Sequence, residues 1–266
     1  MPRANRHYIP GCVWHVTHRC HKQEFLLKFN KDKKRWRHWL YEAKKRYGLC
    51  VLDYIVTSNH IHLLVVDTEK DVIAKSLQLI AGRTAQEFNH RKKRKGAFWE
   101  DRYHATAVET DEHLAKCIVY IDLNMVRARV VKHPADYKLS GFNEIQNPPV
   151  RYAVIDNKAL LDLFSIKDPV DFRKVHSQWI EAEIEADIAK RKSLWSESIA
   201  VGSEEFIGKI QQQLGLRAKG RSVTTENEGT TLKESQAPYN TFFLGKKGTL
   251  RPNNSYFWDL TVRNCG

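Results

Sequence analysis

The chain has 266 residues and a formal net charge of +13, from 44 Lys and Arg against 31 Asp and Glu. This length allows one or two domains with a hydrophobic core. Residues 1–150 hold 27 basic and 16 acidic side chains, whereas residues 151–266 hold 17 and 15, and a basic field of this kind favours a nucleic-acid partner over an anionic membrane surface. The sequence shows no apolar run of bilayer length and no signal-peptide core, so we expect a cytoplasmic protein without a membrane partner.

The cysteines do not predict a disulfide framework. They number five, lie far apart and form no Cys-x-x-Cys pair. The segment holding Cys12, His15, His18, Cys20 and His21 has the composition of a zinc site. It also has the aromatic and β-branched residues of a strand, in which His15 and His18 project to opposite faces. We therefore interpret these residues as ordinary strand residues.

The first half of the chain alternates between strand and helix patterns. In chain order the patterns predict a strand at Val13–Thr17, an amphipathic helix at Lys31–Tyr47, a hairpin of Leu49–Val56 and Ile61–Val66, a helix at Asp71–Asn89, a basic loop at 91–96, a strand at Tyr103–Val108, and a helix from an Asp111 cap to about Asn124. This order predicts an α+β fold with a ferredoxin-like or RRM-like antiparallel sheet. We expect helices on one face of the sheet and an open face for a ligand.

The pattern changes in the second half, after the linker signal at 147–149. We predict a first domain at residues 1–145 and a mainly helical extension at 146–266. A long charged helix is expected at Asp171–Leu194 and a shorter one at Ser203–Leu214. Residues 217–235 are polar and are expected to be mobile, and no period is evident in Tyr239–Gly266.

Two histidines share one face of the third predicted strand. His60 and His62 alternate with apolar residues, so their imidazoles project side by side on the expected open face. Such a pair is half of a metal site and leaves coordination positions for phosphate oxygens. For an isolated pair, two hydrogen-bonded histidines on a half-exposed strand are the commoner explanation.

The helix after the fourth strand carries a second polar face, apart from its apolar stripe. That face holds His113, Lys116, Tyr120, Asn124 and Arg127. Tyr120 could act as a nucleophile, with Asn124 as a third metal ligand and Lys116 or Arg127 near a phosphate. A phenol has a pKa of about 10, so it needs a metal or cation beside it. Spacing alone does not distinguish this nucleophile from an interfacial tyrosine with its hydroxyl in water.

Five segments resemble, in order and spacing, the single-tyrosine HUH transposases of the IS200-like type, and most of all the REP-associated tyrosine transposases. They are Met1-Pro2-Arg3, Tyr8-Ile9-Pro10-Gly11 with His15-Val16-Thr17, Ser58 to Val65, Trp99 to Tyr103, and Tyr120 to Ala128. The likeness spans roughly residues 1–145. Met125 stands where these proteins often carry proline, which bears on the local end of the helix.

The resemblance implies a metal-dependent enzyme that cleaves and rejoins single-stranded DNA. Mg²⁺ or Mn²⁺ would be held by His60, His62 and Asn124, while Tyr120 forms a 5′-phosphotyrosine and leaves a free 3′-hydroxyl, without ATP. Manganese should bind two imidazoles at least as well as magnesium. The implied substrate is a repetitive palindromic DNA hairpin with a single-stranded flank, bound by a monomer or by a homodimer that exchanges its tyrosines.

Clustered basic and aromatic residues would supply DNA contacts, although each charge taken singly is an ordinary surface residue. The candidates are Arg3, Arg6, Lys33, Arg37, Arg91, Lys92, Lys93, Arg94, Trp99, Arg102, Lys116 and Arg127.

Other hypotheses are weaker. Tyr103 is a rival nucleophile, but it does not match the tyrosine of the family. A histidine-triad hydrolase needs a third alternate histidine, and that position is Leu64. A non-catalytic relative that binds DNA hairpins without cutting them is a second hypothesis. An RRM-like RNA-binding protein is a third, and it is weaker because no pair of aromatic residues lies at the positions of the two histidines.

Overall fold

A computed structural model describes residues 8–110, 112–186, 194–215, 221–226 and 229–234 of the chain. The described residues up to Glu234 belong to one compact unit. None of the helices in these ranges is both long enough and apolar enough to cross a membrane.

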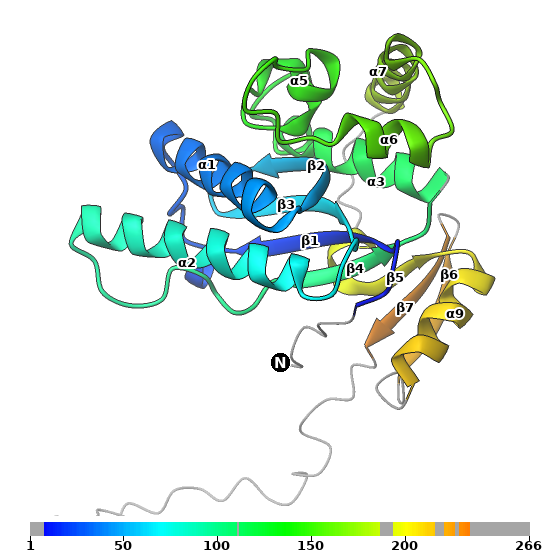
Figure 1. Ribbon diagram of the computed structural model, residues 1–266, viewed down its shortest axis with the longest axis horizontal. Coiled ribbons are helices and arrows are strands. Elements are labelled where there is room, and N and C mark those ends of the chain that lie inside the picture. Colours follow the sequence, from blue (N-terminus) through cyan, green and yellow to red (C-terminus); the bar gives the residue numbers. More distant parts are fainter. Residues whose placement is uncertain (1–7, 111, 187–193, 216–220, 227–228, 235–266) are drawn as a thin grey trace, which may run out of the picture. The chain divides into compact units, whose positions relative to one another are not determined.

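One mixed sheet organises the molecule (Figure 1). Its strands are β1 (Val13–Arg19), β2 (Cys50–Val56), β3 (His60–Val66), β4 (His104–Val108), β5 (Ser198–Gly202), β6 (Arg221–Glu226) and β7 (Gly229–Glu234). Their order across the sheet is β2-β3-β1-β4-β5-β7-β6. Every neighbouring pair is antiparallel except β4 and β5, which are parallel.

The helices follow the strands in the predicted alternation. They are α1 (Asn30–Tyr47), α2 (Val72–Lys92), α3 (Glu112–Asp122), α4 (Asn124–Arg127), α5 (Gly141–Gln146), α6 (Asn157–Leu163), α7 (Pro169–Glu185), α8 (Leu194–Glu197) and α9 (Glu204–Leu214). Gly48 ends α1 in the left-handed conformation that glycine adopts without steric cost. The α+β fold class is thus confirmed.

Helices cover both faces of the sheet, which corrects the expectation of an open face. Helices α1 and α2 lie side by side on the face where Ile61 and Leu63 are buried (Figure 1). The opposite face, with His62, is covered by α3 and by Trp195 of α8. The physical reason is the apolar stripe of α3, since residues such as Ile118 are fully buried and need an apolar surface to pack on.

Several boundaries differ from the sequence predictions. Helix α2 continues through Arg91 and Lys92, and Lys93 ends it in a left-handed conformation by donating its backbone N–H to carbonyls of the last turn. Helix α3 ends at Asp122, and α4 follows as a separate turn. Helix α7 begins early because Asp168 caps it with its carboxylate. Asp111, the predicted cap of the helix that became α3, lies outside the described residues. So do residues 187–193, which belong to the end of the helix predicted at Asp171–Leu194.

The extension contributes strands as well as helices. Residues 217–235 were expected to be polar and mobile, yet β6 and β7 form an antiparallel hairpin there, and Leu232 is fully buried. Each strand holds a short run of β-branched threonines next to one apolar residue, Val223 in β6 and Leu232 in β7, which suits a strand although the composition is polar. Because β5 pairs with β4, the sheet runs across the predicted domain boundary at residue 145, and that boundary stays a prediction.

Candidate active site

The two histidines of β3 lie together under α3. The ring centroids of His60 and His62 are 5.0 Å apart, with nearly perpendicular planes. The side chain of His60 is half-buried, whereas His62 is only 3% exposed. The pair is therefore presented inside a cavity and not on an open sheet face, which corrects the sequence-based expectation.

Tyr120 comes from the last turn of α3 and reaches the histidines of its own chain. Its ring centroid is 5.7 Å from that of His62, with perpendicular planes, and its side chain is 5% exposed. The guanidinium carbon of Arg127 lies 4.3 Å from the Tyr120 ring centroid, and the same guanidinium donates to the Tyr120 carbonyl. One subunit thus brings the phenol, an imidazole and a cation together.

A single cavity of about 350 Å³ contains these groups. It is lined by Thr17, Arg19, Gln23, Asn59, His60, His62, Tyr120, Asn124, Arg127 and Ala128. All of the residues predicted for catalysis or metal binding are in this set, and two arginines give the cavity a positive field. A phosphate is the kind of group that such a field attracts.

Both imidazoles are held through Nδ1, that of His60 by Asn59 and that of His62 by His15 Nε2. The Nδ1 of His60 is 2.8 Å from Asn59 Oδ1, an oxygen that only accepts, so a neutral His60 carries its proton on Nδ1. Burial lowers the pKa of His62 well below its usual value, and a positive charge on His60 or His15 lowers it further. A neutral imidazole is the form that binds a metal ion.

The donor set fits a divalent ion of mixed nitrogen and oxygen preference. Among the described residues, no group of three His, Cys, Asp or Glu side chains comes together as a metal set. Here the third donor would be the amide of Asn124, whose Nδ2 lies 3.1 Å from His62 Nε2. For the amide to act as a ligand it must turn its oxygen toward the same point. Two imidazoles with one amide oxygen suit Mn²⁺ at least as well as Mg²⁺.

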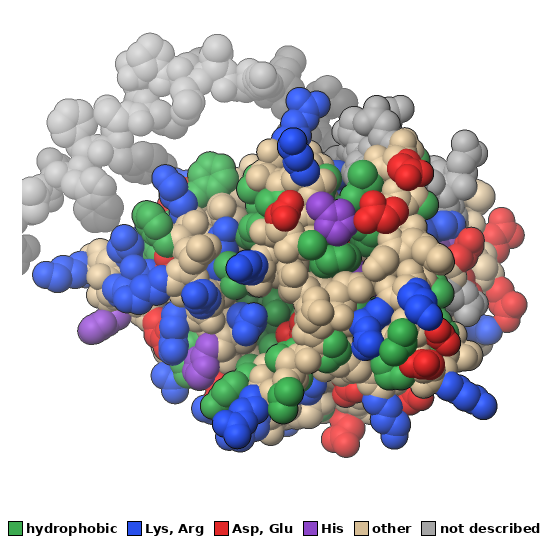
Figure 2. All heavy atoms as spheres, turned by 90° about the horizontal axis from the view of Figure 1, so that it is seen from above, with side chains coloured by type: hydrophobic (Ala, Val, Ile, Leu, Met, Phe, Trp, Pro, Cys, Tyr) green, Lys and Arg blue, Asp and Glu red, His purple; other side chains and the backbone are tan. Residues whose placement is uncertain are grey.

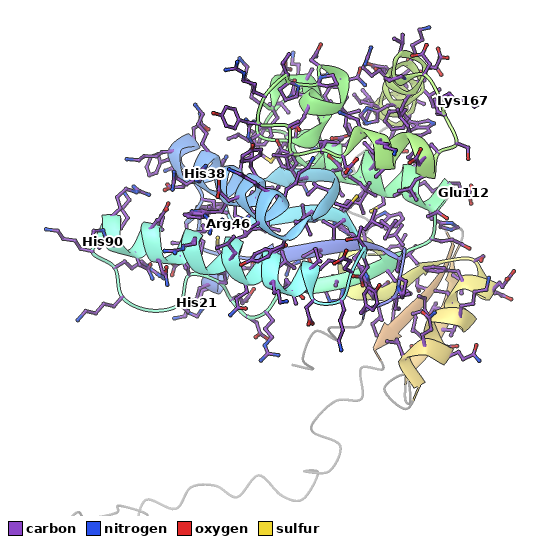
Figure 3. The ribbon with its side chains drawn as sticks, in the orientation of Figure 1. His21, His38, Arg46, His90, Glu112 and Lys167 are labelled. Atoms are coloured by element: carbon purple, nitrogen blue, oxygen red, sulfur yellow. The ribbon has the colours of Figure 1, made fainter. Side chains whose placement is uncertain are left out.

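A second cavity, of about 550 Å³, lies on the other side of Tyr120. It is lined by Glu112, Ala115, Lys116, Val119, Tyr120, Arg127, Phe164, Trp179, Ala182 and Glu183. Figure 3 labels Glu112 at the start of α3 and Lys167 on the segment between α6 and α7. The extension thus supplies aromatic walls next to the tyrosine, which sequence analysis did not predict.

Two candidate DNA contacts are engaged in packing instead. Lys33 is buried, and its ammonium donates to the Tyr137 hydroxyl at 2.8 Å. Trp99 stacks on His18 with ring centroids 4.1 Å apart and donates its indole N–H to the Ala81 carbonyl. Lys33 is thus buried and Trp99 half-buried, and their contacts with DNA stay a prediction.

The basic run at the end of α2 lies on the same end of the sheet as the cavity. Gln23 lines the cavity, and its neighbour Glu24 pairs with Arg94 at 3.7 Å. Lys92 and Lys93 are exposed, while Arg91 pairs with the buried Asp32. Figure 2 shows Lys and Arg side chains gathered at the end of the molecule where α2 terminates.

The remaining predicted contacts are scattered. Arg102 is exposed, Arg37 is half-buried beside a separate groove, and Lys116 pairs with Glu112 at 3.2 Å. Arg3 and Arg6 lie outside the described residues.

The rival sites do not assemble. Tyr103 lines a different cavity with Trp14 and Val16, on the α1 and α2 face of the sheet. His15 and His18 project to opposite faces, as predicted, because one contacts His62 and the other contacts Trp99.

Sequence analysis did not place the residues of β1 in the site. His15, Thr17 and Arg19 alternate along β1 and so share the face of the two histidines, with Thr17 paired opposite His62 and Arg19 opposite His60. The alternation was visible in the sequence. The pairing register, which brings these residues beside β3, was not.

A match to a known protein family covers the part of the chain that holds His60, His62, Tyr120 and Asn124. Residues 9–124 match the family described as IS200-like transposases. A search of curated proteins gave no match. Among solved structures, a REP-associated tyrosine transposase bound to a REP hairpin is 21% identical, with a TM-score of 0.47, covering 59% of this chain and 94% of its own. A candidate transposase from Deinococcus radiodurans R1 is 18% identical, with a TM-score of 0.33, covering 44% of this chain and 92% of its own.

Proposed function

We propose that this chain cleaves and rejoins single-stranded DNA through a covalent bond to Tyr120, a proposal supported by the match of residues 9–124 to the family of IS200-like transposases. The family description gives DNA transposition as the kind of activity. The observation that carries the proposal is the placement of the Tyr120 ring, 5.7 Å from that of His62 and in one cavity with His60, Asn124 and Arg127.

The chemical step is a phosphoryl transfer to the phenol. A bond forms between Tyr120 Oη and the scissile phosphorus as the bond from phosphorus to the 3′ oxygen breaks. The phenol proton passes to water, and the departing 3′ oxygen takes a proton from water. The product is a 5′-phosphotyrosine with a free 3′-hydroxyl. Attack by a 3′-hydroxyl on that linkage rejoins DNA, so no nucleotide cofactor is consumed.

The protein groups around Tyr120 favour this step electrostatically. Arg127 holds a positive charge against the phenol ring, which favours the phenolate and the charge that gathers on the phosphate. Arg19 adds a second positive charge to the same cavity. Low exposure strengthens both effects, because a partly dry site screens charge less than water does.

A divalent ion completes the proposed machinery. His60, His62 and Asn124 would hold it, and the chemistry it supplies when bound is Lewis-acid polarisation of the phosphate. The neutral state of the His62 imidazole, favoured by its burial, suits this role.

The expected substrate is a DNA hairpin with an unpaired flank. A base in a duplex must be unpaired and unstacked before it can enter a protein cavity, whereas an unpaired strand can turn one base aside at a lower energetic cost. The apolar cavity beyond Tyr120 offers Phe164 and Trp179 for such a base, within reach of the phosphate that Tyr120 would attack. The exposed basic run at the end of α2 would follow the backbone.

Removal of the metal is expected to stop cleavage without preventing DNA binding. Purified protein with Mn²⁺ or Mg²⁺ should nick a hairpin oligonucleotide that bears a single-stranded flank and become attached to it, as a band shift on a denaturing gel would show. EDTA should abolish the band, and added Mn²⁺ should restore it. Tight binding to every flanked hairpin tested, with no cleavage under any metal condition, would favour a non-catalytic DNA-binding protein instead.

The aromatic cavity makes a separate prediction about the flank. Trp179→Leu keeps apolar volume but removes the stacking face, so affinity for the flanked hairpin should fall by about 5-fold or more. The loss should vanish when the flanking nucleotide that occupies the cavity is made abasic. Trp39→Leu, on α1 of the opposite face, is the matched control. An equal loss for intact and abasic flanks at every position would exclude base stacking on Trp179.

A further inference from the structure

A row of buried hydrogen bonds runs from the C-terminal extension to the metal-binding candidate His62. The Nδ1 of His15 lies 2.8 Å from the Trp195 carbonyl oxygen. The Nε2 of His15 lies 2.9 Å from His62 Nδ1, with the two rings nearly coplanar at an interplanar angle of 13°. His15 is fully buried, so these two contacts occupy both of its ring nitrogens away from bulk water.

The carbonyl at one end sets the direction of the whole row. A carbonyl oxygen only accepts, so His15 Nδ1 must carry a proton and donate it. In a neutral ring His15 Nε2 is then an acceptor, which requires His62 Nδ1 to donate. His62 Nε2 is left with its lone pair, and the amide nitrogen of Asn124 at 3.1 Å is a donor directed at that atom. All three contacts agree in direction.

The groups around the Trp195 carbonyl hold it in place. Thr106, on β4, donates its one hydroxyl proton to the Ser198 carbonyl at 2.6 Å, and its oxygen lies 3.3 Å from the Trp195 carbonyl oxygen. Strand β5, which starts at Ser198, pairs with β4. The segment that carries the Trp195 carbonyl is therefore tied to the central sheet by the Thr106–Ser198 hydrogen bond and by the pairing of β5 with β4.

We propose that His15 is a positioning residue, which fixes the tautomer and ring orientation of His62 so that Nε2 faces the cavity ready to bind a divalent ion. This inference rests on the proposed function. It also assigns a role to the extension, because residues 194–198 supply the anchoring carbonyl of the active site. A metal-binding histidine whose second nitrogen donates to a fixed acceptor is more basic and better oriented than one without such a partner.

The first test needs neither metal nor DNA. In the metal-free protein with ¹⁵N-labelled histidine, the ring ¹⁵N shifts should show His62 protonated at Nδ1 and unprotonated at Nε2. In His15→Phe, which keeps an aromatic ring but accepts no hydrogen bond, the His62 signals should move toward a mixture of the two tautomers. A parent protein in which His62 carries its proton on Nε2 would overturn the proposal.

The second test measures metal affinity directly. Titration with Mn²⁺, followed by the electron paramagnetic resonance of the free ion, should show a loss of about 10–100-fold in His15→Phe. His15→Gln should recover much of the loss, because its amide oxygen can accept from His62 Nδ1. His18→Phe is the matched control, since it changes a histidine on the same strand that faces the opposite side. Parent-like Mn²⁺ affinity in a folded His15→Phe would contradict the role of His15.

The two proposals can fail separately. If the parent binds Mn²⁺ and shows the expected tautomer but cleaves no DNA, the positioning role of His15 stands and the proposed reaction fails. If the parent cleaves DNA and His15→Phe keeps both the His62 tautomer and the Mn²⁺ affinity, the proposed reaction stands and the positioning role of His15 fails. Should His15→Phe not fold, the parent spectrum and the His15→Gln titration decide the matter.

Discussion

Tyr120→Phe is expected to lower DNA cleavage by at least about a thousandfold and to abolish the covalent protein–DNA adduct. The substitution removes only the hydroxyl, and the ring keeps its contacts with His62 and with the guanidinium of Arg127. Affinity for the flanked hairpin should therefore stay within a few fold of the parent. A denaturing gel with end-labelled oligonucleotide measures the adduct, and a native gel measures binding.

Tyr103→Phe is the control for this experiment. Its hydroxyl lies on the opposite face of the sheet from His62, so cleavage should stay at the parent rate. Parent-like cleavage by Tyr120→Phe, or loss of the adduct in Tyr103→Phe alone, would assign the nucleophile elsewhere.

The sheet could be predicted from sequence because its first four strands carry local signals. In β3 the alternation of histidines with Ile61 and Leu63 fixes which side chains share a face, and Gly48 marks the end of α1. Strands β5 to β7 lacked such signals. They are short and rich in Thr, Ser and Gly, and they are stabilised by pairing with β4, which is distant in sequence.

The site could be predicted only in part, for a similar reason. The spacing of the histidines and the helical face of Tyr120 are properties of single elements, so His60, His62, Tyr120, Asn124 and Arg127 could be grouped. The burial of these side chains depends on where α3 and α8 pack on the sheet, which is set by contacts between distant parts of the chain. The contact of His15 with the Trp195 carbonyl joins residues 180 positions apart, and no local pattern encodes it.

The extension is joined to α3, the helix that carries Tyr120, by a buried polar pair. Asp122, two residues after Tyr120, accepts from His176 of α7 at 2.8 Å, and both side chains have no exposed surface. Gln146 lies 2.9 Å from the other ring nitrogen of His176, and its amide nitrogen can only donate. His176 therefore presents Nε2–H to Asp122 without needing a positive charge. Burial raises the pKa of Asp122, and the His176 hydrogen bond opposes that rise.

Asp122→Ala is expected to lower the free energy of unfolding by about 3 kcal/mol or more, because it leaves the His176 Nε2–H buried without an acceptor and opens a cavity. Asp122→Asn should cost much less, since its amide oxygen can still accept from His176. Urea unfolding followed by fluorescence measures the free energy of unfolding of both variants, and the slope of that free energy with denaturant should stay unchanged.

The Ala variant should also lose cleavage at temperatures where it is still folded, because α7 and the end of α3 hold the aromatic cavity against Tyr120. Equal stability of the Ala and Asn variants would show that the hydrogen bond between α3 and α7 contributes little to the fold.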